Sequence, residues 1–562
     1  MNKLNLLLIV VLITVSCFTQ TKELKEKTAP SPRIVNIINF IRQLEPRSNT
    51  ITEDVLYETV VRQVRQLSEY KLPGTFLLQY DALINPRYQE LLRKELYPGS
   101  EVGGWWEITQ PHVEAAGLIW RGRFPWDWHA DIGFATGYTP EERKKLVDVY
   151  MEKFKAVFGK YPTAVGSWFI DEYTLAYMYD NYHIVASCNC KDQIGTDGYT
   201  MWGGYWNQAY YPSRKNAYMP AQTINGQLPV PIFRMLGSDP IYQYDSGLGG
   251  AVQAVESLEP VYKGGGGNRQ WVEWFFKTVF EEPCLAFGYT QVGQENSFTW
   301  EAMKLGLEIQ IPLLAFLSKE KKIRVETLSE SGAWFKKQFP VTPPTAVTAL
   351  TDHRNNDKKS VWYNSRYYRV NLMWDGSSFR FRDIHLFNEK LESDYLSEAG
   401  TTSECFYTTL PVVDGFLWST TDQLAGLRIM SENRKGEITE VKGGNPVVKE
   451  MDGGILKVEW PLEKSLGTLT LLFFEGRIEL KCESSQKDFT WFFELTASPK
   501  AELPFTTLTH NKINASLKGF DYTVSCTEGT IDDRRNASGN YILRIIPDKN
   551  KIVLDLINNG GV

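Results

Sequence analysis

Residues 33–340 alternate between short apolar runs and longer amphipathic segments. Arg33 to Ile41 is almost continuously apolar, which predicts a buried parallel strand, and Thr52 to Tyr70 carries apolar residues at helical spacing. The same reasoning predicts further strands over 75–80, 102–108, 164–170, 184–188, 230–236, 284–291 and 322–327. Further helices are expected over 86–95, 139–158, 252–261, 269–280, 300–317 and 333–338. Such alternation indicates a parallel sheet, here most simply a closed (β/α)7-type barrel in an α/β fold.

The pattern changes after the turn at Thr342-Pro343-Pro344. Short runs of alternating apolar and polar residues follow one another, separated by Gly, Asn, Asp and Lys, and no long helical period remains. This texture is typical of a β-sandwich. We therefore expect a β/α barrel catalytic domain over 33–340 and an all-β sandwich domain over 345–562.

The N-terminus has the pattern of an export signal. Lys3 is followed by an apolar run from Leu4 to Val15, which is too short to span a bilayer comfortably. Cys17 directly follows Thr14-Val15-Ser16, and this order resembles a bacterial lipobox. We expect a lipoprotein-type signal peptide over 1–17, lipidated at Cys17, and a polar tether over 18–32. The chain would then be an outer-membrane lipoprotein at the cell surface or in the periplasm, attached to the membrane only by its lipid; simple secretion is the alternative.

The composition narrows the choice of partners. Hydrophobic residues make up 43% and charged residues 23%, which suits a packed core, and a net charge of -6 argues against a nucleic-acid partner. Aromatic residues reach 13%. Indole and phenol faces stack on sugar rings, so this enrichment favours a carbohydrate partner, although a large core could absorb the same residues.

Acidic residues follow most of the predicted strands. They are Asp81, Glu107, Asp171, Glu172, Asp239 and Glu295. The carboxyl ends of barrel strands meet at one face, so these side chains are expected to ring one end of the barrel. A glycosidase needs two carboxyl groups, one to protonate the leaving oxygen and one to act as nucleophile or base. The alternative is structural, because acids at strand ends often cap helices, and Asp171 directly precedes one.

Aromatic and polar residues fill the loops that follow these strands. The predicted sugar contacts are Asp81, Trp105, Trp106, Trp126, Trp128, His129, Trp168, Glu172, Trp202, Trp206, Tyr242, Gln291 and Glu295. For His129 an ordinary role in the loop is the alternative. The chain has six histidines and no His-x-x-x-His pair, so we expect neither a metal nor another cofactor.

The segment Trp168-Phe169-Ile170-Asp171 resembles the nucleophile strand of α-mannosidases and of α-amylases with a seven-stranded β/α barrel. Those families share the barrel with polysaccharide deacetylases. The resemblance implies that Asp171 is the nucleophile and Asp239, in Gly-Ser-Asp-Pro, the acid/base, with Glu107 as the substitute. The whole chain is also similar to an uncharacterised family of exported two-domain proteins from Gram-negative carbohydrate degraders.

The sequence departs from these families at their metal sites. It lacks the His-x-Asp zinc motif of class II α-mannosidases, for which Gln79-Tyr80-Asp81 is the nearest match, and the predicted barrel over 33–340 lacks the Asp-Asp pair of the deacetylases. Our leading hypothesis is an exported, retaining glycoside hydrolase that acts on poly- or oligosaccharide. A non-catalytic glycan-binding surface lipoprotein and a polysaccharide deacetylase-like enzyme are the alternatives.

Overall fold

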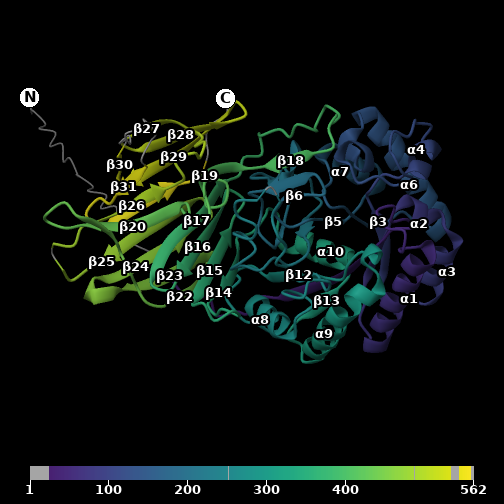
Figure 1. Ribbon diagram of the computed structural model, residues 1–562, viewed down its shortest axis with the longest axis horizontal. Helices are drawn as coiled ribbons and strands as arrows, with labels where there is room; N and C mark the ends of the chain where they lie inside the picture. The colour runs from purple at the N-terminus through teal and green to yellow at the C-terminus, as the bar shows by residue number, and fades with distance from the viewer. Residues whose placement is uncertain (1–23, 251, 487, 533–542, 558–562) are drawn as a thin grey trace, which may run out of the picture.

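The computed structural model describes residues 24–557 except 251, 487 and 533–542. The predicted signal peptide and Cys17 lie outside the described residues. A region of helices around a parallel sheet occupies one end of the molecule, and a region of antiparallel sheets occupies the other (Figure 1). Among the helices that the structure describes, none combines the length and the apolar character needed to cross a bilayer.

Eight parallel strands in the described residues form the barrel-like sheet. The strand order is β12-β1-β2-β3-β4-β5-β11, and β13 pairs with β1 next to β12. Their bounds are β1 (Arg33–Ile41), β2 (Thr75–Leu78), β3 (Glu101–Trp105), β4 (Ala164–Gly166), β5 (Ala186–Asn189), β11 (Ile232–Arg234), β12 (Gly288–Val292) and β13 (Arg324–Glu326). The predicted alternation is confirmed, because every predicted strand of this region overlaps an observed one.

The gap between β11 and β12 is bridged by a side chain. Gln291 Oε1 accepts a hydrogen bond from the Leu236 amide at 2.8 Å, and its Nε2 donates to the Val292 carbonyl at 2.7 Å. Gln291 was predicted to contact sugar. Its amide is instead buried and joins the two unpaired strands.

Helices cover the sheet between successive strands (Figure 1). They are α1 (Glu53–Tyr70), α2 (Tyr80–Ile84), α3 (Pro86–Lys94), α4 (Gln110–Ala115), α5 (Ala130–Gly133), α6 (Pro140–Phe158), α7 (Glu172–Tyr182), α8 (Arg269–Phe280), α9 (Trp300–Lys319) and α10 (Leu328–Gln338). Thr139 begins α6 with a capping box that Glu142 completes. The helix predicted over 252–261 is wrong. The Leu258 amide bonds to the Leu236 and Gly237 carbonyls, so this backbone pairs with the loop after β11.

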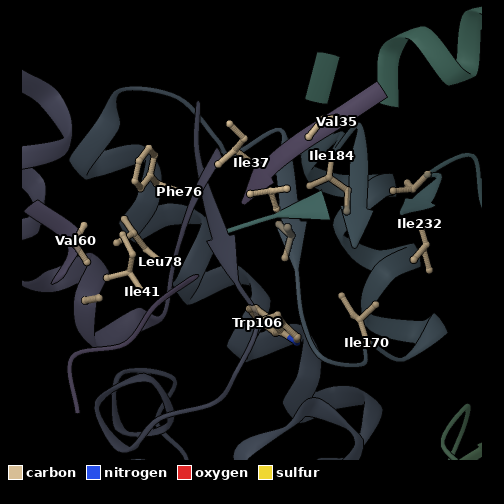
Figure 2. Close-up of a cluster of buried hydrophobic side chains, with 14 of the residues drawn as sticks. Val35, Ile37, Ile41, Val60, Phe76, Leu78, Trp106, Ile170, Ile184 and Ile232 are labelled. Atoms are coloured by element: carbon tan, nitrogen blue, oxygen red, sulfur yellow. The ribbon is translucent and has the colours of Figure 1, made fainter. Parts of the chain in front are cut away.

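The barrel strands bury both of their faces, as expected for a parallel sheet covered by helices. Successive residues of β1 alternate between two cores. Val35, Ile37 and Ile41 belong to the same core as Val60 of α1, and Figure 2 shows Ile41 beside Val60. Ile34, Ile38 and Phe40 belong to the core inside the barrel. All of these side chains are 5% exposed or less. The alternation fixes the register of β1 and therefore the position of the residue that follows it, Arg42.

Two large antiparallel sheets form the C-terminal region. One contains β14 (Thr345–Ala349), β15 (Lys358–Asn364), β16 (Tyr368–Asp375), β17 (Ser378–Leu386), β19 (Leu410–Asp414), β20 (Gly426–Glu432), β21 (Ile438–Glu440), β26 (Trp491–Thr496), β30 (Thr530–Asp532) and β31 (Arg544–Ile546). The other contains β22 (Val447–Met451), β23 (Ile455–Leu462), β24 (Gly467–Phe473), β25 (Arg477–Glu483), β27 (Phe505–Thr509), β28 (Lys512–Leu517), β29 (Phe520–Glu528) and β32 (Lys551–Asp555). Both contribute to one hydrophobic core, for example through Phe381 and Leu471. The predicted fold class, a barrel followed by an all-β region, is confirmed.

The two regions share buried contacts. Between β5 and β11 the chain forms short strands, β6 (Gln193–Thr196), β7 (Tyr199–Trp202), β8 (Ala209–Tyr210), β9 (Pro212–Ser213) and β10 (Asn216–Pro220), and β7 pairs with β18 (Cys405–Thr408). Trp206 stacks on Trp362 of β15 at 3.7 Å with an interplanar angle of 2°. The predicted tether is also attached, since Lys27 contacts both Leu285 and Glu450.

Candidate active site at the carboxyl ends of the strands

Arg42 connects two buried glutamates at the carboxyl ends of the barrel strands. It follows β1 directly, while Glu107 lies two residues beyond β3 and Glu295 three residues beyond β12. Arg42 donates from Nε to Glu107 Oε2 at 2.9 Å and from Nη2 to Glu107 Oε1 at 2.5 Å. Its third nitrogen, Nη1, lies 2.8 Å from Glu295 Oε2. One guanidinium therefore holds two carboxyl groups from distant parts of the chain.

Neutral side chains complete the hydrogen bonding of this pair. Gln79 directly follows β2 and donates to Glu107 Oε2. Ser297 donates from its hydroxyl to Glu295 Oε1 at 2.7 Å. Arg42, Glu107 and Glu295 are 3%, 1% and 4% exposed, so the cluster is closed to solvent in this structure.

The loop after β3 covers the cluster. The guanidinium of Arg42 lies 4.2 Å from the ring centroid of Trp126, and the guanidinium of Arg47 lies 5.2 Å from the same ring. Arg47 also reaches Trp128 at 5.4 Å and forms an ion pair with Glu45 at 2.7 Å. Trp126 and Trp128, both predicted to contact sugar, are thus stacked beside cations at the mouth of the barrel. His129, next to Trp128, is only half-buried.

Burial changes the ionisation of the acids in this region. It raises the pKa of Glu295 to about 7, and the nearby Glu107 acts in the same direction while Arg42 opposes both. Burial also raises the pKa of Asp81 to about 7, partly offset by a hydrogen bond from the Ala82 amide. A carboxyl group with a pKa near neutrality is suited to donate a proton at physiological pH. Glu295 therefore has the property that a general acid requires.

The residues around this cluster do not fit a metal ion. The guanidinium of Arg42 already pairs with both Glu107 and Glu295, so it would repel a metal ion bound by the same carboxyl groups. In the described part of the chain, no three His, Cys, Asp or Glu side chains are grouped so that they could hold an ion. His112 lies nearby in sequence, but its Nε2 donates to the Leu146 carbonyl at 2.8 Å, and burial lowers its pKa to about 4.

Asp171 is committed to the structure of its own helix. It is the N-cap of α7, and its Oδ1 accepts from the Thr174 amide at 2.8 Å and from Arg143 Nη1 at 2.9 Å. Both Asp171 and Arg143 are fully buried. The capping alternative raised by its sequence position is therefore realised.

Asp239 is bound by a different set of donors. Its Oδ1 accepts from the Ile241 and Tyr242 amides, and its Oδ2 accepts from Trp271 Nε1 at 2.9 Å and lies 3.1 Å from His353 Nε2. Within the described residues, Asp171 and Asp239 share no hydrogen-bond or ion-pair partner. The structure brings Glu107 and Glu295 together instead of the two aspartates.

Most of the other predicted sugar contacts lie in the core. Trp105 stacks on Phe40 inside the barrel, and Trp106 packs edge-on against His112. Trp202 and Trp206 belong to the contact with the C-terminal region and are at most 2% exposed. The buried members of the predicted set, which do not line an open surface here, are Asp81, Trp105, Trp106, Trp126, Trp168, Glu172, Trp202, Trp206, Gln291 and Glu295. Glu172 accepts from the Ala217 amide and from Ser393, and Tyr242 donates to Asp352.

Several residues of the cluster were missed in the sequence. Arg42 directly follows the predicted strand 33–41 and Gln79 lies inside the predicted strand 75–80, but the catalytic candidates named at the strand ends were all acids. Lys191 and Glu259 were missed as well; Glu259 accepts from Gln294 Nε2 at 2.8 Å, next to Glu295. The rule that polar residues at the carboxyl ends of barrel strands meet at one face would have found Arg42, Gln79 and Lys191.

Comparison with known proteins shows the fold. No family model and no curated protein matches the chain. A candidate glycoside hydrolase/deacetylase from Parabacteroides distasonis has a TM-score of 0.51 at 16% identity, over 69% of this chain and 91% of that chain. A candidate polysaccharide deacetylase from Mycobacterium smegmatis has a TM-score of 0.33 at 13% identity, over 57% of this chain and 96% of that chain. A 4-alpha-glucanotransferase from Thermococcus litoralis has a TM-score of 0.29 at 8% identity, over 94% of this chain and 99% of that chain. The last two structures overlap too loosely for a comparison of residues. The expected resemblance to barrels of the glycoside hydrolase and deacetylase kind is confirmed for the fold.

Proposed function

We propose that this chain is a carbohydrate-active hydrolase in which Glu107 and Glu295 are the reacting pair. The observation that carries this proposal is the shared guanidinium of Arg42, which holds two buried carboxyl groups at the end of the barrel where such enzymes build their sites. The likeness in fold to a candidate glycoside hydrolase/deacetylase supports the substrate class.

The two glutamates differ as the reaction requires. Glu295, whose pKa burial raises to about 7, gives its proton to the glycosidic oxygen as the bond from that oxygen to the anomeric carbon breaks. Glu107, the anionic partner of Arg42, adds to the anomeric carbon. Water then displaces Glu107 and gives a proton to Glu295, which restores both carboxyl groups to their starting forms. This sequence retains the anomeric configuration. Arg42 holds both side chains, and Trp126 packs against its guanidinium.

Acid-to-amide variants test the assignment. Hydrolysis of a panel of 4-nitrophenyl glycosides should fall by about 10²–10⁴-fold in Glu295→Gln and Glu107→Gln. Asp171→Asn and Asp239→Asn, each measured per folded molecule, should stay within about tenfold of the parent because both aspartates bind structural partners. Full activity in both glutamine variants would exclude this pair. The anomer released first, followed by proton NMR, distinguishes retention from inversion.

Glycan binding without turnover is the second candidate. The closed state of the cluster and the capping role of Asp171 favour it. Under this hypothesis, glycans would bind the parent and Glu295→Gln alike and no glycoside would be cleaved by either.

We also propose that the chain is exported and lipidated at Cys17. Metabolic labelling with a fatty acid should mark the parent and leave Cys17→Ser unlabelled. Labelling of both proteins would contradict lipidation at this residue.

A further inference from the structure

Arg234 is a buried cation with unused hydrogen-bond donors. It ends β11 and is 1% exposed. Its Nη2 donates to Asp192 Oδ1 at 2.5 Å and to the Tyr218 hydroxyl at 3.4 Å, while Nε and Nη1 make no hydrogen bond. Buried polar groups in proteins are almost always paired with protein, water or a ligand. The Tyr210 hydroxyl lies near this guanidinium, but Nε and Nη1 still lack a hydrogen bond, so they can donate to an acceptor that the protein itself does not supply.

Lys191 is a second buried cation; in the described part of the chain it forms no short ion pair, although Glu259 attracts it from farther away. It is 2% exposed, and its hydrogen bond is a 3.5 Å contact from Nζ to the Asp192 carbonyl, which is long for such a bond. The β5–β11 register pairs Arg234 with Asn189, two residues before Lys191, so both cations lie at the carboxyl ends of neighbouring strands. Burial lowers the pKa of Lys191; Cys190, Glu259 and Asp192 oppose this shift, and the nearby Arg234 adds to it.

Asp192 cannot neutralise both of these cations. Its Oδ2 already binds Arg369 of β16 and accepts from the Gly203 amide at 3.0 Å. Arg369 in turn is held by Asp383 at 2.8 Å. The carboxylate of Asp192 is thus shared between two arginines and does not pair with Lys191. A buried charge without an ion-pair partner lowers the stability of the fold.

We propose that Lys191 and Arg234 bind an anionic substituent of the substrate, a carboxylate or a sulfate carried by a sugar ring. The inference rests on the proposed function and narrows it to acidic saccharides. Charge-assisted hydrogen bonds from an arginine and a lysine are the usual way to hold such groups. Gln193 adds a neutral donor, because its Nε2 is buried and makes no hydrogen bond.

This anion site is continuous with the proposed reacting pair. Glu259 attracts Lys191 electrostatically and accepts from Gln294 Nε2 at 2.8 Å, and Gln294 precedes Glu295. Lys191 lies at the carboxyl end of β5, and Gln294 and Glu295 lie at the carboxyl end of β12. Glu259 connects the two ends. A sugar with its charged group at Lys191 would extend toward the Glu107–Glu295 pair.

Calorimetric titration of the full chain with three matched trimers tests the proposal. They are a galacturonate trimer, a 6-sulfated galactose trimer and a neutral galactose trimer. At low salt at least one charged trimer should bind about tenfold or more tightly than the neutral one, which corresponds to one charge-assisted hydrogen bond. Added salt should narrow the difference. The tighter of the two charged trimers identifies the substituent as carboxylate or sulfate.

The decisive variant is Lys191→Met, which removes the charge and keeps the aliphatic stem. It should melt close to the temperature of the parent, because Glu259, the carboxylate that Lys191 attracts, keeps its hydrogen bonds from Ser257 and Gln294. It should also lose the preference for charged trimers. Lys215→Met, which removes an exposed lysine paired with Glu392, is the control and should keep the preference. Equal binding of all three trimers, no binding of either charged trimer, or a preference that survives in Lys191→Met would overturn the proposal.

The result also separates this inference from the proposed hydrolysis. Preference for a charged trimer with no cleavage of any glycoside would leave the anion site standing and remove the hydrolase. Cleavage of 4-nitrophenyl glycosides without any preference for a charged trimer would support the hydrolase and remove the anion site.

Discussion

Arg42 binds Glu107 through two nitrogens of its guanidinium, Nε at 2.9 Å from Oε2 and Nη2 at 2.5 Å from Oε1. Both side chains are almost completely buried, at 3% and 1% exposure. Two parallel contacts of this kind fix the planes of both groups as well as their distance. The ends of β1 and β3 are therefore joined by an ion pair that water does not screen, and the barrel depends on it at this face.

Removing the guanidinium should destabilise the fold strongly. In Arg42→Met, Glu107 and Glu295 lose their shared cation while they remain buried, and the free energy of unfolding should fall by about 3–5 kcal/mol. Urea denaturation measures this change. Arg62→Met removes an exposed pair with Glu58 and should cost less than about 1 kcal/mol. Equal effects of the two variants would contradict the structural role of Arg42.

Glu295 should make the stability depend on pH. Burial raises its pKa from 4.5 to about 7, so the folded state binds the proton more tightly than the unfolded state. Its contribution is complete below about pH 4.5 and is lost as the pH rises through about 7, by roughly 1.4 kcal/mol for each tenfold change in acidity. Glu295→Gln should flatten the stability profile in this window.

The window is shared with two other acids, because burial raises the pKa of Asp81 and of Glu172 to about 7 as well. Glu295→Gln should therefore remove only part of the slope, as thermal unfolding between pH 4 and 8 would measure. Glu58→Gln, at an exposed site, should leave the slope unchanged. If Glu295 is the general acid, kcat of the parent should also decline above about pH 7. An unchanged slope in Glu295→Gln would show that this carboxyl group is not protonated in the fold.

Asp171 should prove to be a structural residue. Asp171→Ala removes the N-cap of α7 and the carboxylate partner of the buried Arg143, so the free energy of unfolding should fall by about 3 kcal/mol or more. Activity per folded molecule should stay close to that of the parent. Chemical denaturation combined with active-site titration separates the two effects. A stable but inactive Asp171→Ala would restore Asp171 as the nucleophile that the sequence suggests.

The stack between Trp206 and Trp362 should couple the two regions of the molecule. The rings are 3.7 Å apart and nearly parallel, and both side chains are at most 2% exposed. Trp362→Ala should cost about 3–5 kcal/mol through the cavity it leaves. We expect the single thermal transition of the parent to separate into two in differential scanning calorimetry. A matched truncation within the C-terminal core, Trp460→Ala, should lower the melting temperature without separating the transitions.

The sequence by itself determined the order and type of the elements. The continuous apolar run of β1 and the capping box at Thr139 act locally, through side-chain alternation and hydrogen bonds a few residues apart. They therefore predicted eight strands and most of the helices of the barrel. The helix predicted over 252–261 is the exception. Its local sequence is compatible with a helix, but the Leu258 amide bonds to carbonyl groups in the loop after β11.

Only the tertiary structure decided which polar residues meet. Asp171 and Glu295 both follow barrel strands, and although Asp171 directly precedes a helix, the sequence does not show which distant side chain reaches either of them. Asp171 is satisfied by its own helix and by Arg143, whereas Glu295 is reached by an arginine more than two hundred and fifty positions away in the chain. The role of Trp206 could not be predicted for the same reason, because an indole that stacks on a sugar and one that stacks on Trp362 look alike in the sequence. Which partner a side chain finds depends on contacts between distant segments, and these form only when the barrel closes and the C-terminal sheets pack against it.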